Sequence, residues 1–197
     1  MRSRILEASV EFGIKILTIY AFSTENWQRP DSEVQGLLGI LEQMLKREVK
    51  NLHGNGVRLR HLGRTEGLSQ GLQEEIGKAI DLTRDNTRIT LNVAFNYGGR
   101  MEIVDACRRL LADKVDPTRV DEALLSSYLY TAGQADPDLI IRTSGEMRLS
   151  NFLVWQAAYA EYYCAPTYWP DFDKEELRKA LVAYGQRKRR FGGLNPS

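Results

Sequence analysis

Short apolar runs alternate with segments of helical periodicity along the whole chain, and this alternation is the feature that most limits its fold. Residues 14–22 (IKILTIYAF) form a nearly continuous apolar run, which is typical of a strand buried on both faces. The segment 34–52 instead has apolar residues at steps of three and four, as in an amphipathic helix: Val34, Leu38, Leu41, Leu45, Val49 and Leu52. We predict that Asp31 or Ser32 caps this helix behind Pro30.

The same alternation continues to the end of the chain. We expect an amphipathic helix within residues 1–13, a turn at 53–56, strands at 57–62, 89–95, 138–141 and near 161–164, and helices at about 68–84, 100–112, 121–130, directly after Ser150 and at about 174–190. This order favours an α/β fold with a mainly parallel central sheet flanked by helices. We see no internal repeat or interdomain linker, so residues 1–197 are predicted to form a single domain.

The composition argues against several classes of protein. The chain has 27 basic and 26 acidic residues and a formal charge of +1, so it lacks the global charge of a nucleic-acid or membrane-surface binder, and any anion site must be local. No window approaches the ~20 apolar residues that span a bilayer. We interpret Cys107 and Cys164 as buried free thiols in a reducing compartment, in preference to the alternative of a disulfide. The expected location is the cytoplasm.

Polar residues follow three of the predicted strands. The segments are 23–30 (STENWQRP), 96–100 (NYGGR) and 142–151 (RTSGEMRLSN). Ligands of parallel α/β sheets bind beyond the carboxyl ends of the strands, where these segments lie. Together they are expected to form an anion-binding rim.

The third of these segments offers arginines suited to phosphate. Arg142 follows the strand directly, while Arg148 and Ser150 fall where the next helix is expected to begin, so side-chain donors and helix N–H groups could converge on one phosphate. The structural alternative is that Arg142 pairs with Glu146 or Asp138 and that Ser150 only caps the helix.

The first segment and Glu161 leave comparable alternatives. Ser23, Asn26, Trp27 and Arg29 supply hydroxyl, amide, aromatic and cationic groups directly after a buried strand, or else form a side-chain-stabilised turn with Trp27 filling a gap beneath it. Glu161 opens an aromatic strand. It could hold a hard cation such as Mg²⁺, or be a paired structural glutamate.

Two further features have two interpretations each. Leu37, Ile40 and Met44 form a second apolar stripe on the helix at 34–52, which could line a tunnel for a long hydrocarbon or pack between two layers. The basic residues 187–190 precede glycine, which is ordinary helix termination, but they could also complete an anion site in a partner subunit.

Six strings occur in one order: FSTENWQRP, NYGGR, RTSGEMRLSNF, WQAAYAEYY, WPDF and RRFGG. Together they resemble the cis-prenyltransferases, of which undecaprenyl diphosphate synthase is the bacterial type, over residues 4–193. The resemblance implies a fold with a hydrophobic tunnel and an enzyme that condenses isopentenyl diphosphate onto an allylic diphosphate such as farnesyl diphosphate. It further implies a long cis-polyprenyl product such as undecaprenyl diphosphate, Mg²⁺ as cofactor, a homodimer, and transient membrane contact at product release.

The resemblance also implies roles for individual residues. By motif, Ser23, Thr24 and Glu25 are similar to part of the substrate-binding loop, Asn26 stands in the place of the residue assigned to proton removal, and Trp27 and Arg29 are further substrate contacts. In the same way Arg142, Arg148, Leu149 and Ser150 match residues that hold isopentenyl diphosphate, Glu161 matches the magnesium-binding glutamate, and Arg190 belongs to the tail that reaches across the dimer.

Two departures from the family pattern stand beside these matches. Family members begin with an Asp-Gly-Asn-Gly-Arg-Trp-type loop that supplies an essential aspartate, and we expect this chain to start after it, as a truncated form or through an incomplete start-site assignment. The similar string at 53–57 (HGNGV) is interpreted as a turn. Met147 stands where some members carry a metal-associated histidine, and a thioether is a poor ligand for a hard cation.

Two other functions are weighed against the enzyme. One is a noncatalytic prenyltransferase-like subunit, or inactive fragment, that supports a complete partner. The other is an unrelated phosphate-binding α/β module, which the ordered motifs argue against.

Overall fold

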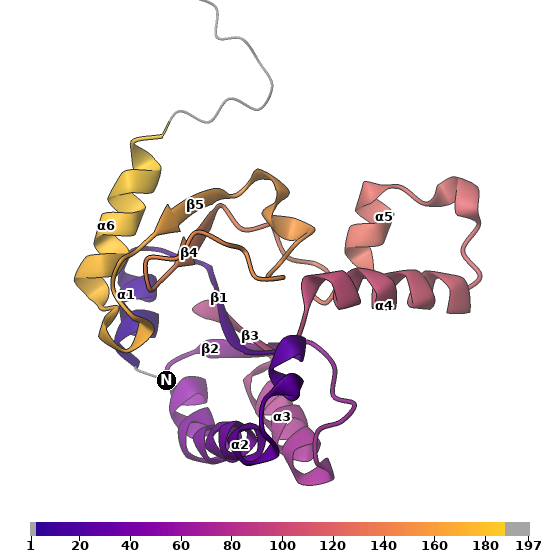
Figure 1. Ribbon diagram of the computed structural model, residues 1–197, viewed down its shortest axis with the longest axis horizontal. Coiled ribbons are helices and arrows are strands. Elements are labelled where there is room, and N and C mark those ends of the chain that lie inside the picture. Colours follow the sequence, from indigo (N-terminus) through magenta and orange to yellow (C-terminus); the bar gives the residue numbers. More distant parts are fainter. Residues whose placement is uncertain (1–2, 188–197) are drawn as a thin grey trace, which may run out of the picture. The chain divides into compact units, whose positions relative to one another are not determined.

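The computed structural model describes residues 3–187, drawn as a ribbon in Figure 1. Its elements are α1 (Ser3–Glu11), β1 (Ile16–Ser23), η1 (Thr24–Gln28), α2 (Asp31–Gly54), β2 (Val57–Leu62), α3 (Gln70–Thr83), β3 (Ile89–Tyr97), α4 (Gly99–Ala112), η2 (Pro117–Arg119), α5 (Glu122–Ser127), β4 (Leu139–Arg142), η3 (Gln156–Tyr159), β5 (Glu161–Cys164), η4 (Trp169–Asp171) and α6 (Lys174–Gly185), where η denotes a 3₁₀ helix. The described residues form two compact units, one made of residues 3–135 and 151–155 and the other of residues 136–150 and 156–187.

The first unit contains a three-stranded parallel sheet in the order β1-β3-β2. Parallel neighbours require crossover connections, which α2 and α3 supply. Both helices pack against β2 and against each other (Figure 1). The register places Ser23 opposite Tyr97 and Leu62 opposite Ala94, so the three carboxyl ends lie at one edge of the sheet. The segments after β1, β2 and β3 therefore meet there.

The core of the first unit lies between this sheet and its helices. Its buried members come from every layer, namely Leu6 of α1, Val34, Leu41 and Leu45 of α2, Leu72, Ile76 and Ala79 of α3, and Phe22, Leu59, Leu91 and Phe95 of the strands. Each fully buried large side chain contributes about 1.5–3 kcal/mol relative to an exposed one. This packing holds the strand ends that carry the candidate site.

The second unit contains the parallel pair β4 and β5, with Leu139 opposite Glu161 and Arg142 opposite Cys164. Helix α6 packs on β5, and the Tyr184 hydroxyl donates to the Asp138 carboxylate at 3.4 Å. In the described part of the chain, no helix has both the length and the apolar character needed to cross a membrane.

The structure confirms the α/β class and the parallel pairing, and β2 and β5 have the predicted bounds. The strands form a three-stranded and a two-stranded sheet, where one central sheet was expected.

Three sequence-based predictions are wrong. No α-helix follows Ser150, because Ser150, Asn151 and Leu153 have φ values of 51°, 60° and 45°, which a right-handed helix cannot contain. Residues 151–155 form turns. Neither Asp31 nor Ser32 caps α2, which begins at Asp31 and continues through the first half of the predicted turn at 53–56.

The cysteines also differ from the prediction. Cys107 is exposed on α4 and Cys164 is partly exposed on β5, so neither is a buried thiol, although both are free. The buried stripe of α4 includes Ala106 and Leu110, and Cys107 lies just outside it.

Candidate functional site

The polar residues after β1 form a compact 3₁₀ turn, here called the 23–29 turn. The backbone N–H of Ser23 donates to Asn26 Oδ1 at 2.8 Å, and the N–H of Arg29 donates to the Asn26 carbonyl at 3.1 Å. Asn26 thus closes the turn with both its side chain and its main chain. This is the side-chain-stabilised turn that was one of the two interpretations of the segment.

Trp27 is fixed by the end of β3. Its indole Nε1 donates to Asn96 Oδ1 at 2.7 Å, and its ring packs edge-on against Phe22 with centroids 5.4 Å apart. A partly buried indole needs such a polar partner for its N–H. The ring therefore has a defined orientation beside the turn.

Glu25 is held by Asn151, whose Nδ2 donates to Glu25 Oε1 at 2.8 Å, while the Thr24 hydroxyl donates to Oε2 at 3.1 Å. Partial burial acts to raise the pKa of Glu25, but hydrogen bonds from Asn151 and from the turn outweigh it, and the pKa lies below 4.5. Burial and the negative charge of Glu25 together raise the pKa of Tyr20 to about 12. Glu25 is therefore ionised at neutral pH, beside the neutral phenol of Tyr20.

Gly98 allows the segment 96–100 to approach the turn closely. A Cβ at this position would lie 2.6 Å from Thr24 Oγ1 and 2.8 Å from Asn151 Nδ2. Only glycine permits that approach. The structure thus brings the first two predicted polar segments together at one edge of the sheet.

Arg29 ends the turn and pairs with Glu33 of α2 at 2.7 Å, with both side chains about half exposed. Exposed pairs of this kind contribute about 0.2–1 kcal/mol. The guanidinium group can therefore exchange its partner at little cost.

In the second unit, residues 142–150 form what we call the arginine loop. Arg142 and Arg148 both pair with the carboxylate of Glu146, one guanidinium on each oxygen. The loop is held by hydrogen bonds from Ser144 N–H to the Thr167 carbonyl at 2.9 Å and from Gly145 N–H to the Ala165 carbonyl at 2.8 Å. Two guanidinium groups thus converge on one oxyanion.

The electrostatics of the arginine loop follow from this pairing. The hydrogen bond from Arg142 and the positive charge of Arg148 hold the pKa of Glu146 below 4.5. Arg148 is 63% exposed, whereas Arg142 Nε is buried and has no hydrogen-bond partner among residues 3–187. The Arg142–Glu146 pair was the structural alternative for Arg142. Leu149 and Ser150 follow, with Ser150 exposed and without the helix that it was expected to cap.

Glu161 opens β5 as a paired carboxylate. Arg187 Nη1 donates to Glu161 Oε2 at 2.5 Å and Arg187 Nη2 donates to the Tyr162 carbonyl at 2.7 Å. Residues 3–187 contain no group of three or more acidic, histidine or cysteine side chains that could hold a metal by themselves. Mg²⁺ commonly uses one or two carboxylates and completes its shell with phosphate and water oxygens, so Glu161 fits as a single protein ligand.

A cavity of about 220 Å³ lies within the first unit. Its wall is mainly apolar, with Leu6 from α1, Met44 from α2, Ile76 from α3 and Leu91 from β3 among the lining residues. Of the predicted second stripe on α2, Met44 lines the cavity, Leu37 packs against the core and Ile40 is 64% exposed.

Two residues without a predicted role, Asn96 and Asn151, lie at the turn. Both lie in segments predicted to be polar strand ends, and both have positive φ. Asparagine is one of the few residues that adopts this backbone readily, which is the only local signal they offer. Arg190, the remaining predicted site residue, lies outside the described residues.

Two relatives align with nearly the whole chain. An isoprenyl transferase of Heliobacterium mobile is 53% identical over 195 residues, covering 97% of this chain and 75% of that protein. An isoprenyl transferase of Fusobacterium nucleatum is 50% identical over 191 residues, covering 97% of this chain and 82% of that protein.

Solved structures agree with the sequence matches. The lavandulyl diphosphate synthase of Lavandula x intermedia, in complex with dimethylallyl diphosphate, has a TM-score of 0.91 at 36% identity and covers 97% of this chain and 84% of its own. A probable undecaprenyl diphosphate synthase of Campylobacter jejuni has a TM-score of 0.89 at 33% identity, with coverage of 97% and 89%. The Prenyltransf family model, whose description reads "Putative undecaprenyl diphosphate synthase", matches residues 2–192, and the chain belongs to that family.

Proposed function

We propose that the protein is an isoprenyl transferase that condenses isopentenyl diphosphate onto an allylic diphosphate such as farnesyl diphosphate, giving a long cis-polyprenyl diphosphate such as undecaprenyl diphosphate. The observation that carries this proposal is the convergence of Arg142 and Arg148 on a single carboxylate. Glu146 stands where a substrate oxyanion would bind, and the planar guanidinium fork binds phosphate as well as carboxylate.

The chemistry follows from charge development. As the bond between the allylic carbon and the diphosphate oxygen breaks, negative charge grows on the departing diphosphate, and fixed positive charge stabilises this state more than the ground state. The double bond of isopentenyl diphosphate attacks the allylic carbon, and a proton then leaves the condensed product. We assign binding of isopentenyl diphosphate to Arg142, Arg148, Leu149 and Ser150, and further substrate contacts to the 23–29 turn.

Asn26 is a poor base, and its Oδ1 already accepts the hydrogen bond that closes the turn. We therefore assign it a role in orienting the substrate or relaying the proton to diphosphate or water. Trp27 and Arg29 belong to the same turn. Trp27 is fixed by its hydrogen bond to Asn96, and Arg29 is held by an exposed ion pair with Glu33.

The cavity suits the growing hydrocarbon, because each CH₂ moved from water to an apolar wall contributes about 0.8 kcal/mol. Glu161 is the residue that would hold Mg²⁺, which when bound supplies positive charge to the diphosphate. We also propose a homodimer, a cytoplasmic location and transient membrane contact at product release, in keeping with the family resemblance.

The experiment is incorporation of radiolabelled isopentenyl diphosphate with farnesyl diphosphate and Mg²⁺. It compares residues 1–197 with a protein extended upstream by the aspartate loop that the family pattern includes, and the product is sized by chromatography. Incorporation into long products by either form supports the proposal. A protein that binds isopentenyl diphosphate but incorporates none in either form would instead be the noncatalytic subunit.

A further inference from the structure

Asn96 links three segments at the carboxyl edge of the sheet. It is 5% exposed and has a φ of 50°. Its Oδ1 accepts from Trp27 Nε1 at 2.7 Å, and its Nδ2 donates to the carbonyls of Arg64 and Glu66 at 3.1 and 3.0 Å. One side chain therefore joins the 23–29 turn, the end of β3 and the loop after β2.

Asn151 makes an equivalent link on the other side of the turn. Its φ is 60°. Its Nδ2 donates to Glu25 Oε1 at 2.8 Å, its Oδ1 accepts from the N–H of Arg100 at 2.9 Å, and its carbonyl accepts from the N–H of Gly99 at 2.7 Å. Glu25 is thereby tied to the first turn of α4.

Asparagine is specifically suited to both positions. Each link needs a donor and an acceptor on one short side chain, which a carboxamide supplies and a carboxylate does not. Each backbone is left-handed, which asparagine tolerates better than most residues. Glycine would keep the backbone and lose the link, whereas aspartate would keep the acceptor and lose the donor.

The loop that Asn96 contacts is itself fixed. Gly63 comes so close to β3 that a Cβ there would lie 2.2 Å from the Phe95 carbonyl oxygen. The next residue, Arg64, donates from Nε to Asp105 Oδ2 at 2.6 Å, and the Tyr130 hydroxyl donates to the same oxygen at 2.6 Å.

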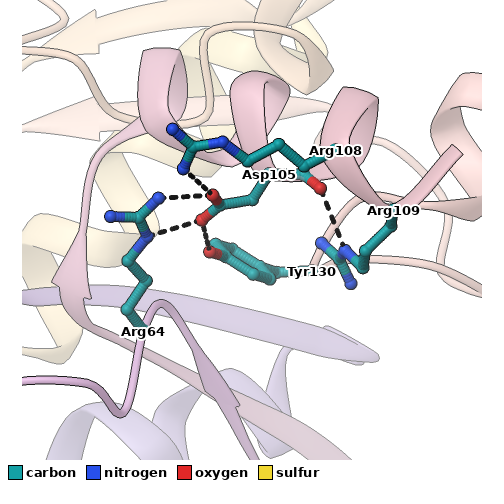
Figure 2. A network of polar contacts seen from close by, with 5 residues as sticks. All are labelled: Arg64, Asp105, Arg108, Arg109 and Tyr130. Carbon is teal, nitrogen blue, oxygen red and sulfur yellow. Dashed lines mark hydrogen bonds and ion pairs between the residues drawn. The ribbon is translucent and has the colours of Figure 1, made fainter. Parts of the chain in front are cut away.

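Figure 2 shows this network, with Asp105 of α4 between Arg64 and Tyr130. Arg108 adds a contact to Asp105 Oδ1 at 3.3 Å, and the Arg109 guanidinium lies 5.3 Å from the centroid of the Tyr130 ring. Charge-assisted bonds of this kind are the stronger ones in proteins. Asn96 therefore connects Trp27 to a rigid support.

We propose that Asn96 and Asn151 are positioning residues, which hold Trp27 and Glu25 in the orientation that the 23–29 turn needs to contact the diphosphate. The inference rests on the proposed function, since it presumes that this turn contacts substrate. It goes further in assigning the geometry of the turn to two residues outside it.

The first test follows the Trp27 indole N–H by NMR of protein labelled with ¹⁵N-tryptophan. The chain has three tryptophans, and Trp27→Phe identifies the signal. In Asn96→Gly this signal should move toward the position of a solvent-exposed indole while the other two stay. The matched control is Asn92→Ser, which alters another buried asparagine of β3 that bonds Thr18 and Gln134. An unchanged Trp27 signal in Asn96→Gly would overturn the Asn96 assignment.

The second test reverses the Asn151–Glu25 bond. Asn151→Asp places a second carboxylate against Glu25, and the amide protons of the 23–29 turn should exchange faster with solvent. Adding Glu25→Gln restores an amide–carboxylate pair with the opposite direction, and protection should return. If Asn151→Asp leaves the exchange rates unchanged, or if the double variant does not recover them, the Asn151 assignment is wrong.

Steady-state kinetics then test whether Asn96 positions the turn. They are measured in whichever form of the protein incorporates isopentenyl diphosphate. Misplacement of a substrate-contacting group by about 1 Å can cost roughly 10²-fold in rate. We expect Asn96→Gly to lower kcat by roughly this factor with a smaller change in KM, and Asn92→Ser to change neither. A displaced Trp27 signal with wild-type kcat would refute positioning, whereas wild-type protein that neither binds nor incorporates isopentenyl diphosphate would refute the proposed function instead.

Discussion

The 23–29 turn and the arginine loop both present polar groups that the family resemblance assigns to substrate, but they are held in different ways. In the turn, Trp27 and Glu25 bond to side chains from distant parts of the chain, Asn96 and Asn151. In the arginine loop, the two arginines share a carboxylate only a few residues away, Glu146. The side chains of the turn are held by tertiary contacts, whereas the guanidinium groups of the arginine loop are paired with a carboxylate of the same loop.

This difference indicates two kinds of binding site. Groups fixed in advance need no reorganisation when charge develops on a substrate. Arg142 and Glu146 are each about one-third exposed and Arg148 is mostly exposed; ion pairs near the surface contribute little to stability and exchange with a stronger ligand. We expect the turn to keep its geometry when substrate binds, and the arginine loop to exchange Glu146 for diphosphate.

The largest effect should come from removing the arginines. Hydrogen bonds to charged groups contribute about 1.5–3 kcal/mol each, so Arg142→Ala with Arg148→Ala should weaken isopentenyl diphosphate binding roughly 10²-fold or more by calorimetry. Stability should change by only about 1 kcal/mol or less, because these ion pairs lie near the surface. Arg178→Ala on α6, which removes a more exposed pair with Glu175, is the control and should leave binding unchanged. Equal losses in both would show that only general positive charge matters.

The second-largest effect should be a loss of stability when the network around Asp105 is weakened. Asp105→Asn weakens the bonds to Arg64 and Tyr130 and should cost about 1–3 kcal/mol in urea unfolding. Asp81→Asn is the control, since its pair with Arg84 at 3.5 Å is exposed. A loss in the control as large as in Asp105→Asn would contradict the special role of this network.

The carboxylate of Asp105 also makes the stability of the protein depend on pH in the acidic range. The hydrogen bond from Arg64 outweighs partial burial and lowers the pKa of Asp105 from 3.8 to about 2. A carboxyl whose pKa is lower in the folded than in the unfolded state stabilises the protein at pH values above the unfolded-state pKa. This contribution to the free energy of unfolding is lost as the pH falls from about 4 toward 2. Asp105→Asn should show a shallower loss over that window, measured by urea midpoints at each pH.

The first unit should also respond to pH near neutrality, through His61 on the cavity wall. Burial lowers its pKa below 6.5, although Nε2 lies 2.8 Å from the Phe95 carbonyl. The unfolded chain then binds more protons, so the stability contributed by neutral His61 is present above pH 6.5 and is lost below it. His61→Leu should remove this dependence. The other histidine, exposed His53, gives the control His53→Gln, which should retain it.

The smallest effect should be a gain in affinity for isopentenyl diphosphate. Glu146→Gln removes the carboxylate that competes with diphosphate for Arg142 and Arg148, and isopentenyl diphosphate binding should tighten a few-fold, within the roughly 1.4- to 5-fold that exposed pairs correspond to. Glu175→Gln on α6 should leave affinity unchanged. Weaker binding in Glu146→Gln would mean that Glu146 takes part in recognition rather than competing with it.

Much of the fold follows from local patterns in the sequence. The bounds of β2 and β5 agree with the prediction, because β2 follows a glycine-containing turn and β5 is a short aromatic segment. The helix predicted after Ser150 is absent for a local reason as well. Three residues there adopt a left-handed backbone, which the helix-like apolar composition of the segment does not reveal.

The candidate site was predictable only in part. The residues of the 23–29 turn and the arginine loop stand in recognisable strings, and the Arg142–Glu146 pair was foreseen as an alternative. The links to Asn96 and Asn151 were not, because they join positions 69 and 126 residues apart in the chain. Such contacts depend on the register of β1 against β3 and on the path of the later turn, which no local pattern specifies.

A crystal structure of the protein with isopentenyl diphosphate would show whether the arginine loop exchanges its carboxylate for substrate. Diphosphate oxygens should lie on the guanidinium groups of Arg142 and Arg148, with Glu146 displaced and the Trp27–Asn96 hydrogen bond retained. Diphosphate bound elsewhere while both arginines remain on Glu146 would contradict this exchange.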